Sequence, residues 1–363
     1  HRPATHRPEP LAIEEIAMLN ESTYYCPECD DGRDHQHTPT RRQFIRTLGG
    51  GTVALIAGGV LSTRLLAADS TAGTSKRPAE ELIRELHASL SESQRSELVF
   101  PWEHQSDGAP TRLGTFNQPV FNKRIDDFYT PAQRDLVERV VRAIMADDDA
   151  FERLSRNNTW DSSGSFGGCG AVLFGDPEGK EPFSWVFAGH HLTLRCDGNS
   201  QPGTAFGGPL YYGHSANGYS DANVYLYQTQ QVHKVFDALD PHQRQAALAP
   251  TNPGDGLSAI RFRSPEEPRP GVAYADLSSD QQELVADVMR VLISPFRKED
   301  GDEVMELIRV NGGMEKIHLA FFRDGELASR QRWDVWRLEG PGFVWNFRVL
   351  PHVHCFVNIA TIS

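Results

Sequence analysis

Long hydrophobic runs are missing from this chain of 363 residues. A helix that crosses a membrane needs about 20 consecutive apolar residues. The most apolar stretch, residues 48–61, is shorter and is interrupted by five glycines. We therefore expect no stable membrane span in the mature protein.

Positive charge is also scarce. The chain has 36 Lys and Arg residues against 49 Asp and Glu residues, a formal net charge of -13. Nucleic acids and anionic membrane surfaces attract an excess of basic residues. The composition argues against both partners, and the partner we expect is a small-molecule substrate or ligand.

Common catalytic motifs are absent as well. We find no phosphate loop, no dinucleotide fingerprint and no Gly-x-Ser-x-Gly elbow. Cysteines are few, and only Cys169, Cys196 and Cys355 follow the first 80 residues. In an oxidising compartment Cys169 and Cys196 would suit a disulfide that leaves Cys355 free. Three unpaired core cysteines fit the sequence equally well.

Residues 40–72 resemble a twin-arginine export signal. Arg41 and Arg42 precede a weakly apolar stretch, and small residues that suit cleavage follow it. An ordinary secretion signal or a retained anchor is the alternative. The signal predicts the twin-arginine translocase as a partner and a periplasmic or extracellular location. Residues 1–39 are then an N-terminal extension, and residues 73–80 a linker.

One helix-start pattern occurs four times in the rest of the chain. A capping residue is followed three positions later by Gln, which predicts a capping box. The four pairs are Ser91 with Gln94, Thr130 with Gln133, Asp240 with Gln243, and Ser278 with Gln281. The clearest helices are expected at 130–147 and 278–294. Alternating apolar residues predict strands at 169–175, 183–188, 191–196, 317–323, 331–338, 343–349 and 352–359. Asp324-Gly325 suits a hairpin turn.

The spacing of these patterns indicates an internal duplication. Ser91 and Asp240 are 149 positions apart, and Thr130 and Ser278 are 148 apart. A similar offset relates the strand of Trp185 to that of Trp336. We therefore expect an α+β fold in which a helix-pair plus antiparallel-sheet unit occurs twice, at 81–239 and 240–363, packed as one body. Chance similarity of short apolar segments is the alternative.

Histidines are the strongest candidates for a functional site. They occur as His190-His191, as His214 and as His352-Val353-His354. Residues two apart on a strand share a face, so His352 and His354 form a ready pair of metal ligands. His190 and His191 would point to opposite faces of a regular strand, so at most one would join them, with Gly189 permitting a bend.

Other side chains near the histidines in sequence are candidates too. Trp185, Trp336 and Trp345 lie on the aromatic strands and either pack in the sheet or stack on a ligand. The nearest acidic residues along the sequence are Asp334, Glu339 and Glu315. None of these acids forms a distinctive catalytic pair.

Several segments resemble one known family. Trp185-Val186-Phe187-Ala188-Gly189-His190-His191-Leu192 is similar to the hallmark of the domain-of-unknown-function 3500 family. The segments 206–209, 336–341 and 352–354 resemble further elements of that family, whose members are often exported. Cys355-Phe356-Val357-Asn358 departs from the Arg-Asp segment usual after the last histidines. The resemblance implies a shared fold and site over about residues 80–363, and no reaction.

Two functions fit these patterns. The first is an exported metal-dependent enzyme, a hydrolase or oxidoreductase, in which His190, His191, His352, His354 and His214 hold Zn, Cu or Fe. The second is an exported protein that binds a ligand or metal without turnover. An open metal position beside an acid or base would favour the enzyme.

The signal generates a direct prediction. Replacing Arg41 and Arg42 with Lys should leave the precursor in the cytoplasm, because the translocase reads the paired arginines. Fractionation of cells that express each version measures this. Unchanged export of the double variant would contradict the prediction.

Overall fold

The computed structural model describes residues 78–362, apart from 107, 180 and 323–332. The predicted signal, the N-terminal extension, the linker up to residue 77 and the Asp324-Gly325 turn lie outside the described residues. The first helix begins at Ala79, within the last residues assigned to the linker. Among the helices of the described part, none is long and apolar enough to cross a membrane.

The chain forms helices and then strands, twice. The first half contains α4 (Ala79–Ser89), α5 (Glu92–Leu98), β1 (Val99–Phe100), β2 (Gln105–Ser106), β3 (Ala109–Pro110), α6 (Ile125–Phe128), α7 (Pro131–Ile144), α8 (Asp148–Leu154), β4 (Gly170–Gly175), β5 (Phe183–Gly189), β6 (Leu192–Cys196) and β7 (Leu210–Asn217). The second half contains α9 (Leu226–Ala238), α10 (Pro241–Ala247), β8 (Leu248–Ala249), β9 (Val272–Ala273), α11 (Ser279–Ile293), α12 (Lys298–Val310), β10 (His318–Phe322), β11 (Val335–Gly340), β12 (Phe343–Arg348) and β13 (His352–Ile359). Without the short elements β2, β3, α6 and β9, the order is the same in both halves.

The four predicted capping boxes are confirmed at the starts of α5, α7, α10 and α11. In each box the side chain of the capping residue accepts a hydrogen bond from the backbone N–H of the Gln. The Gln side-chain oxygen in turn accepts a hydrogen bond from the backbone N–H of the capping residue. The glutamines also pair between helices. The Gln94 amide donates to Gln133 at 2.7 Å, and the Gln243 amide donates to Gln281 at 3.0 Å. These bonds fix the two helices of each pair against each other.

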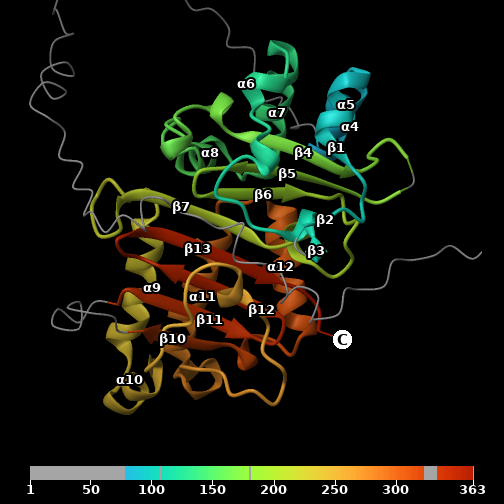
Figure 1. Cartoon of the computed structure of the whole chain (residues 1–363). Helices are drawn as coiled ribbons and strands as arrows, with labels where there is room; N and C mark the ends of the chain where they lie inside the picture. Colours follow the sequence, from blue (N-terminus) through green and yellow to red (C-terminus); the bar gives the residue numbers. More distant parts are fainter. Residues whose placement is uncertain (1–77, 107, 180, 323–332, 363) are drawn as a thin grey trace, which may run out of the picture. The chain divides into compact units, whose positions relative to one another are not determined.

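In the described part of the chain, one sheet of eleven strands contains all the long strands, in the order β1-β4-β5-β6-β7-β13-β12-β11-β10-β8, with β9 beside β10 (Figure 1). Only the pairings of β1 with β4 and of β8 with β10 are parallel among the described residues. The predicted strands are present, although β11 lies at 335–340 rather than 331–338. The α+β class is confirmed.

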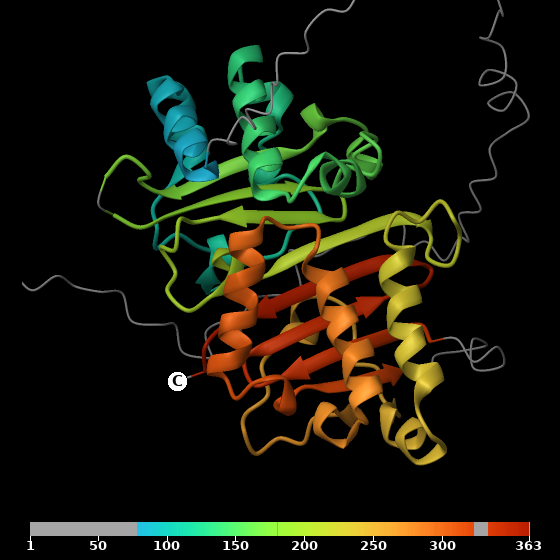
Figure 2. The same cartoon turned by 180° about the vertical axis from the view of Figure 1, so that it is seen from behind.

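Helices cover one face of the sheet. Figure 2 shows α9, α11 and α12 in front of the second half and α4 and α7 in front of the first. The strands turn a continuous apolar surface toward them. On β13, Val353, Cys355, Val357 and Ile359 join this core, while His352 and His354 point to the opposite face. The period of two predicted for this strand is therefore confirmed.

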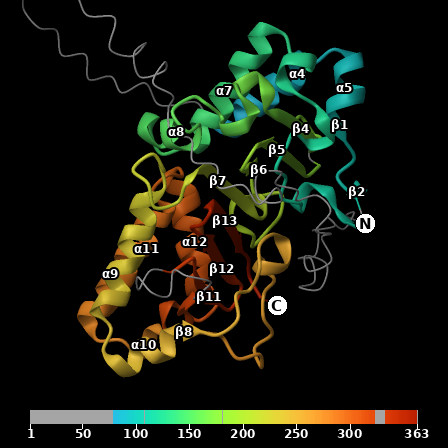
Figure 3. The same ribbon diagram turned by 60° about the vertical axis from the view of Figure 1, so that its left-hand side comes forward.

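Segments without long helices cover the other face (Figure 3). A second apolar cluster joins the strands to residues from 109–113 and 260–262. Arg337 donates to the Ala259 carbonyl, and Asn358 donates to the Ile260 carbonyl at 3.1 Å. These bonds fix the segment after β8 across the sheet, on the face to which the β13 histidines point.

The disulfide suggested for Cys169 and Cys196 is not formed. Cys169, Cys196 and Cys355 are all free and buried. Cys169 precedes β4 and Cys196 ends β6, with β5 between these strands. The Cys196 thiol instead contacts the Glu80 carboxylate at 3.4 Å. The cysteines are therefore core residues.

The glutamine pairs generate a stability prediction. Replacing Gln243 with Ala removes its bonds to Asp240, Asp276 and Gln281, so the free energy of unfolding should fall by about 1–2 kcal/mol. Gln245 is exposed on the same helix, and its replacement with Ala should change stability by less than about 0.5 kcal/mol. Urea denaturation compares the two. Equal effects would refute a role for the pair.

Candidate metal centre

The first arm of the site is the hairpin turn between β5 and β6. Gly189 pairs with Leu192, so His190 and His191 form the turn itself. His191 has a left-handed backbone, with φ 52°, as does Gly342 (φ 59°) in the turn between β11 and β12. A residue other than Gly costs about 1–2 kcal/mol there. The sequence uses a strained conformation to present His191.

One expectation about this turn was wrong, and the other does not apply. His190 and His191 lie in the turn rather than in a regular strand, with ring centroids 4.1 Å apart, and only His191 joins the β13 pair, within the expected limit of one. Gly189 does not supply the bend. A Cβ there would lie 2.7 Å from the Cys169 sulfur, so Gly189 is required by close packing.

The second arm is the start of β13. His352 and His354 share one face, as expected, and both are buried. Their Nε2 atoms lie 3.0 Å apart. β13 pairs with β7, and the register shifts between His352 and Val353. The irregularity is therefore at the first residue of β13, His352.

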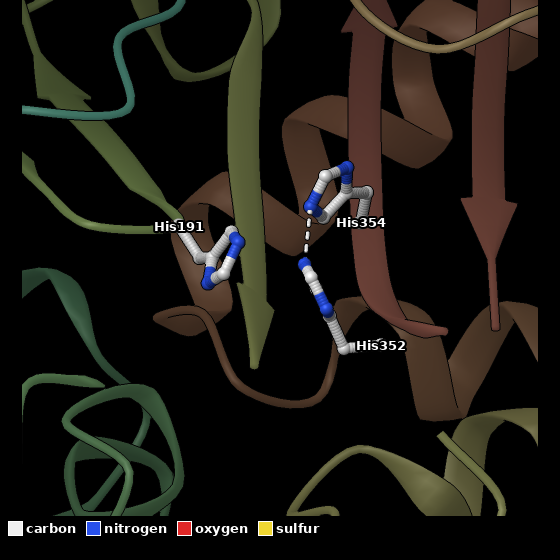
Figure 4. A group of neighbouring side chains, drawn as sticks. All are labelled: His191, His352 and His354. Carbon is white, nitrogen blue, oxygen red and sulfur yellow. Dashed lines mark hydrogen bonds between the residues drawn. The ribbon is translucent and has the colours of Figure 1, made fainter. Parts of the chain in front are cut away.

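His191 meets the β13 pair across the bare backbone of β7 (Figure 4). Gly213 is the register partner of His354, and it lies next to the His191 side chain. A Cβ on Gly213 would be 3.2 Å from the His191 Cβ and 2.1 Å from the Val353 carbonyl oxygen. Only Gly fits at this position, and its lack of a side chain lets the imidazole of the first half reach those of the second.

The three imidazoles form one cluster. The His191 ring centroid is 4.8 Å from that of His352 and 4.9 Å from that of His354. One ring nitrogen from each histidine lies within 4.8 Å of the other two. Ligands about 2.0–2.1 Å from a tetrahedral zinc lie roughly 3.3 Å apart. Small side-chain movements would bring all three to a metal ion.

Carboxylates orient two of these rings. His191 Nδ1 bonds the Asp161 carboxylate, and His354 Nδ1 lies 2.6 Å from Asp255 Oδ2. An ionised carboxylate only accepts, so each Nδ1 donates and each neutral Nε2 keeps its lone pair. Such pairs orient metal-binding histidines in proteins. Since His354 Nε2 must then accept, His352 Nε2 donates the bond between them, and a metal would displace that proton.

A strained segment holds Asp161 in place. Five residues between 156 and 161 have positive φ although none is Gly, namely Arg156, Asn157, Asn158, Trp160 and Asp161. The Trp160 ring packs on Phe151, Phe166 and Phe187, which anchors the segment. Strain of this kind persists where the surroundings enforce it, often at functional sites.

Burial controls the protonation of the centre. Burial lowers the pKa of His191 well below its ordinary value, against the opposing effect of the Asp161 hydrogen bond. Burial alone would raise the pKa of Asp161, but the His191 bond and the charge of Arg156 bring it below its usual range. A neutral imidazole beside an ionised carboxylate is the state that a metal requires.

The other predicted histidines lie beside this cluster. His190 is half-buried and forms a second group with Asp161 and His191 that could hold a metal. The backbone N–H of His190 donates to Ser163 Oγ at 2.7 Å. His214 Nδ1 is 3.9 Å from Asp161 and accepts the Ala216 N–H at 3.2 Å. Neither belongs to the three-histidine cluster, although both share Asp161 with it.

The tryptophans are not a stacking surface. Trp185, Trp336 and Trp345 are each 0% exposed and belong to the helix-covered core. The Trp336 ring stacks on Phe347, 4.6 Å away. With no ring face accessible, the structure supports packing and contradicts ligand stacking.

The carboxylates that matter were not predicted. Of the acids singled out, Asp334 accepts the Leu350 N–H and Glu339 pairs with Arg337 and Arg263, so both are structural. Asp161 and Asp255 lie far from His191 and His354 in sequence. No spacing pattern could have found them, because irregular segments bring them to the site.

Fold and geometry together define an α+β protein with a buried three-histidine centre that could hold a metal. The chain belongs to the family described as Protein of unknown function (DUF3500), which matches residues 72–358. No curated protein and no solved structure matches the chain.

The buried histidine generates a pH prediction. In the unfolded chain the pKa of His191 is about 6.5. Below that pH the unfolded chain binds a proton that the folded chain does not, so stability of the metal-free protein should fall as pH drops. Urea denaturation from about pH 7.5 to about pH 5 measures the slope.

Replacing His191 with Gln should flatten this pH dependence, whereas replacing the exposed His242 with Ala should not. The same slope in the His191→Gln variant as in the wild type would contradict the assignment.

Proposed function

We propose that this protein is a metal-dependent enzyme whose metal is bound by His191, His352 and His354. The proposal rests on one observation. Ring nitrogens of the three histidines lie close together, and carboxylates bind two of the rings by hydrogen bonds. Imidazole suits Zn, Cu and Fe, so the metal is a divalent transition ion of this group.

The number of ligands favours catalysis. Among the described residues, the cluster at the β13 pair contains three histidines and no fourth candidate ligand. Catalytic sites typically have three protein ligands and an open fourth position, whereas structural sites are closed. A metal with an open position supplies Lewis acidity and lowers the pKa of a bound water to about 7.

Further groups that can transfer protons lie next to the cluster, around Asp161. His190 and His214 are half-buried, and Ser215 donates to the Asp161 carboxylate. Imidazoles next to a metal site suit proton transfer in a hydrolytic or redox reaction. The reaction class, hydrolase or oxidoreductase, follows from the metal that is bound.

A binding protein without turnover is the second candidate. The observation in its favour is burial, since His191 and His354 are 0% exposed and His352 is 4% exposed. A deeply buried ion exchanges ligands with difficulty, as expected of a storage or structural centre.

Export and duplication complete the proposal. Arg41 and Arg42 and the weak apolar stretch after them support export by the twin-arginine route. Equivalent glutamine pairs, and the parallel pairing of β1 with β4 and of β8 with β10, support an ancient duplication of the helix-pair plus sheet unit. The centre then lies at the seam between the copies.

Metal analysis tests the proposal. The purified chain should bind about one divalent ion, and X-ray absorption should find three imidazoles and one exchangeable light ligand. His354→Ala should abolish tight binding. Asp161→Asn and Asp255→Asn should weaken it by about 10–100-fold, because the rings lose their orienting bonds.

His242→Ala serves as the matched control, since this exposed histidine lies on α10. Absence of any bound metal would overturn the proposal. A fourth protein ligand on the metal would rule out the proposed enzyme and favour the binding protein without turnover.

A further inference from the structure

Each orienting carboxylate has an arginine beside it. Asp255 Oδ2 bonds His354 Nδ1, and Arg348 Nη1 lies 2.6 Å from the same oxygen. On the other side, the guanidinium of Arg156 donates to the His190 carbonyl at 2.7 Å, one residue from His191. Both histidine–carboxylate pairs thus have a neighbouring positive charge.

Because each arginine offsets one carboxylate, no negative charge remains to balance the charge of a bound metal ion. The two carboxylates carry two negative charges, the two arginines carry two positive charges, and metal-binding imidazoles are neutral. Farther from the histidines, Arg195 of β6 lies near Arg112 and Asp197, and these three groups add one further positive charge. A buried charge without a counter-charge is costly, so the open position should favour an anion.

The two arginines differ in what they can contact. Arg156 is 1% exposed, and carbonyls of Leu154 and His190 accept its terminal N–H groups. Arg348 is the register partner of His354, so its side chain lies on the same face, and it is 15% exposed. Arg348 therefore lies where a molecule from solvent can meet it.

We propose that the substrate is a small oxyanion, a carboxylate or phosphate, with one oxygen at the open metal position and its charge facing Arg348. This inference rests on the proposed metal site. Guanidinium recognises both groups through charge-assisted hydrogen bonds. Although the chain has a net charge of -13, the positive charge at this site would attract anionic ligands to it.

Co²⁺-loaded full-length protein provides the test, because its visible spectrum reports the fourth ligand. The probes are acetate, inorganic phosphate and the neutral analogue acetamide. Acetate or phosphate should change the spectrum saturably, and acetamide should not. Arg348→Gln should weaken binding of the anion by about tenfold or more, and Arg348→Lys by less.

Arg309→Gln is the matched control, since Arg309 lies at the surface of α12 and its loss changes the net charge equally. Acetamide binding as tightly as acetate, or equal anion affinities in Arg348→Gln and Arg309→Gln, would overturn the oxyanion proposal while the metal site stands. Failure to take up Co²⁺ would overturn the proposed function and this inference with it.

Discussion

The pairing of β7 with β13 at the middle of the sheet is the constraint on which the centre depends. It joins the first half of the chain to the second and brings the turn of His191 to the first residues of β13. Gly213 makes this approach possible, because a side chain there would collide with the Val353 carbonyl and crowd His191. The centre is thus a property of the seam between the halves, and neither half contains it alone.

Much of the fold could be predicted because its signals are local. A capping box depends on two residues three positions apart, and all four boxes are present. Strand positions follow from alternation, which on β13 correctly assigns His352 and His354 to one face. The order of strands in the sheet could not be predicted, because the pairing of β7 with β13 joins residues more than 130 positions apart.

The site could be predicted only in part, and the limit is physical. The ligand pair on β13 follows from pleat geometry, whereas His191 depends on a left-handed turn that periodicity does not encode. Asp161 is presented by a run of left-handed residues, and Asp255 by an irregular segment that crosses the sheet. Tertiary contacts enforce both positions. The same reasoning explains the tryptophans, whose burial depends on helices far away in sequence.

Backbone strain and buried charge around the histidines support the proposal that this centre is the functional part of the molecule. Elsewhere the long strands are regular and present apolar faces to the helices. Around the histidines, left-handed residues and buried charges occur together. Such groups lower the stability of a fold unless surrounding contacts or a bound group compensate for them. The proposed metal, held by neutral imidazoles, would replace the hydrogen bond that His352 and His354 make to each other, and the proposed oxyanion would neutralise the remaining charge.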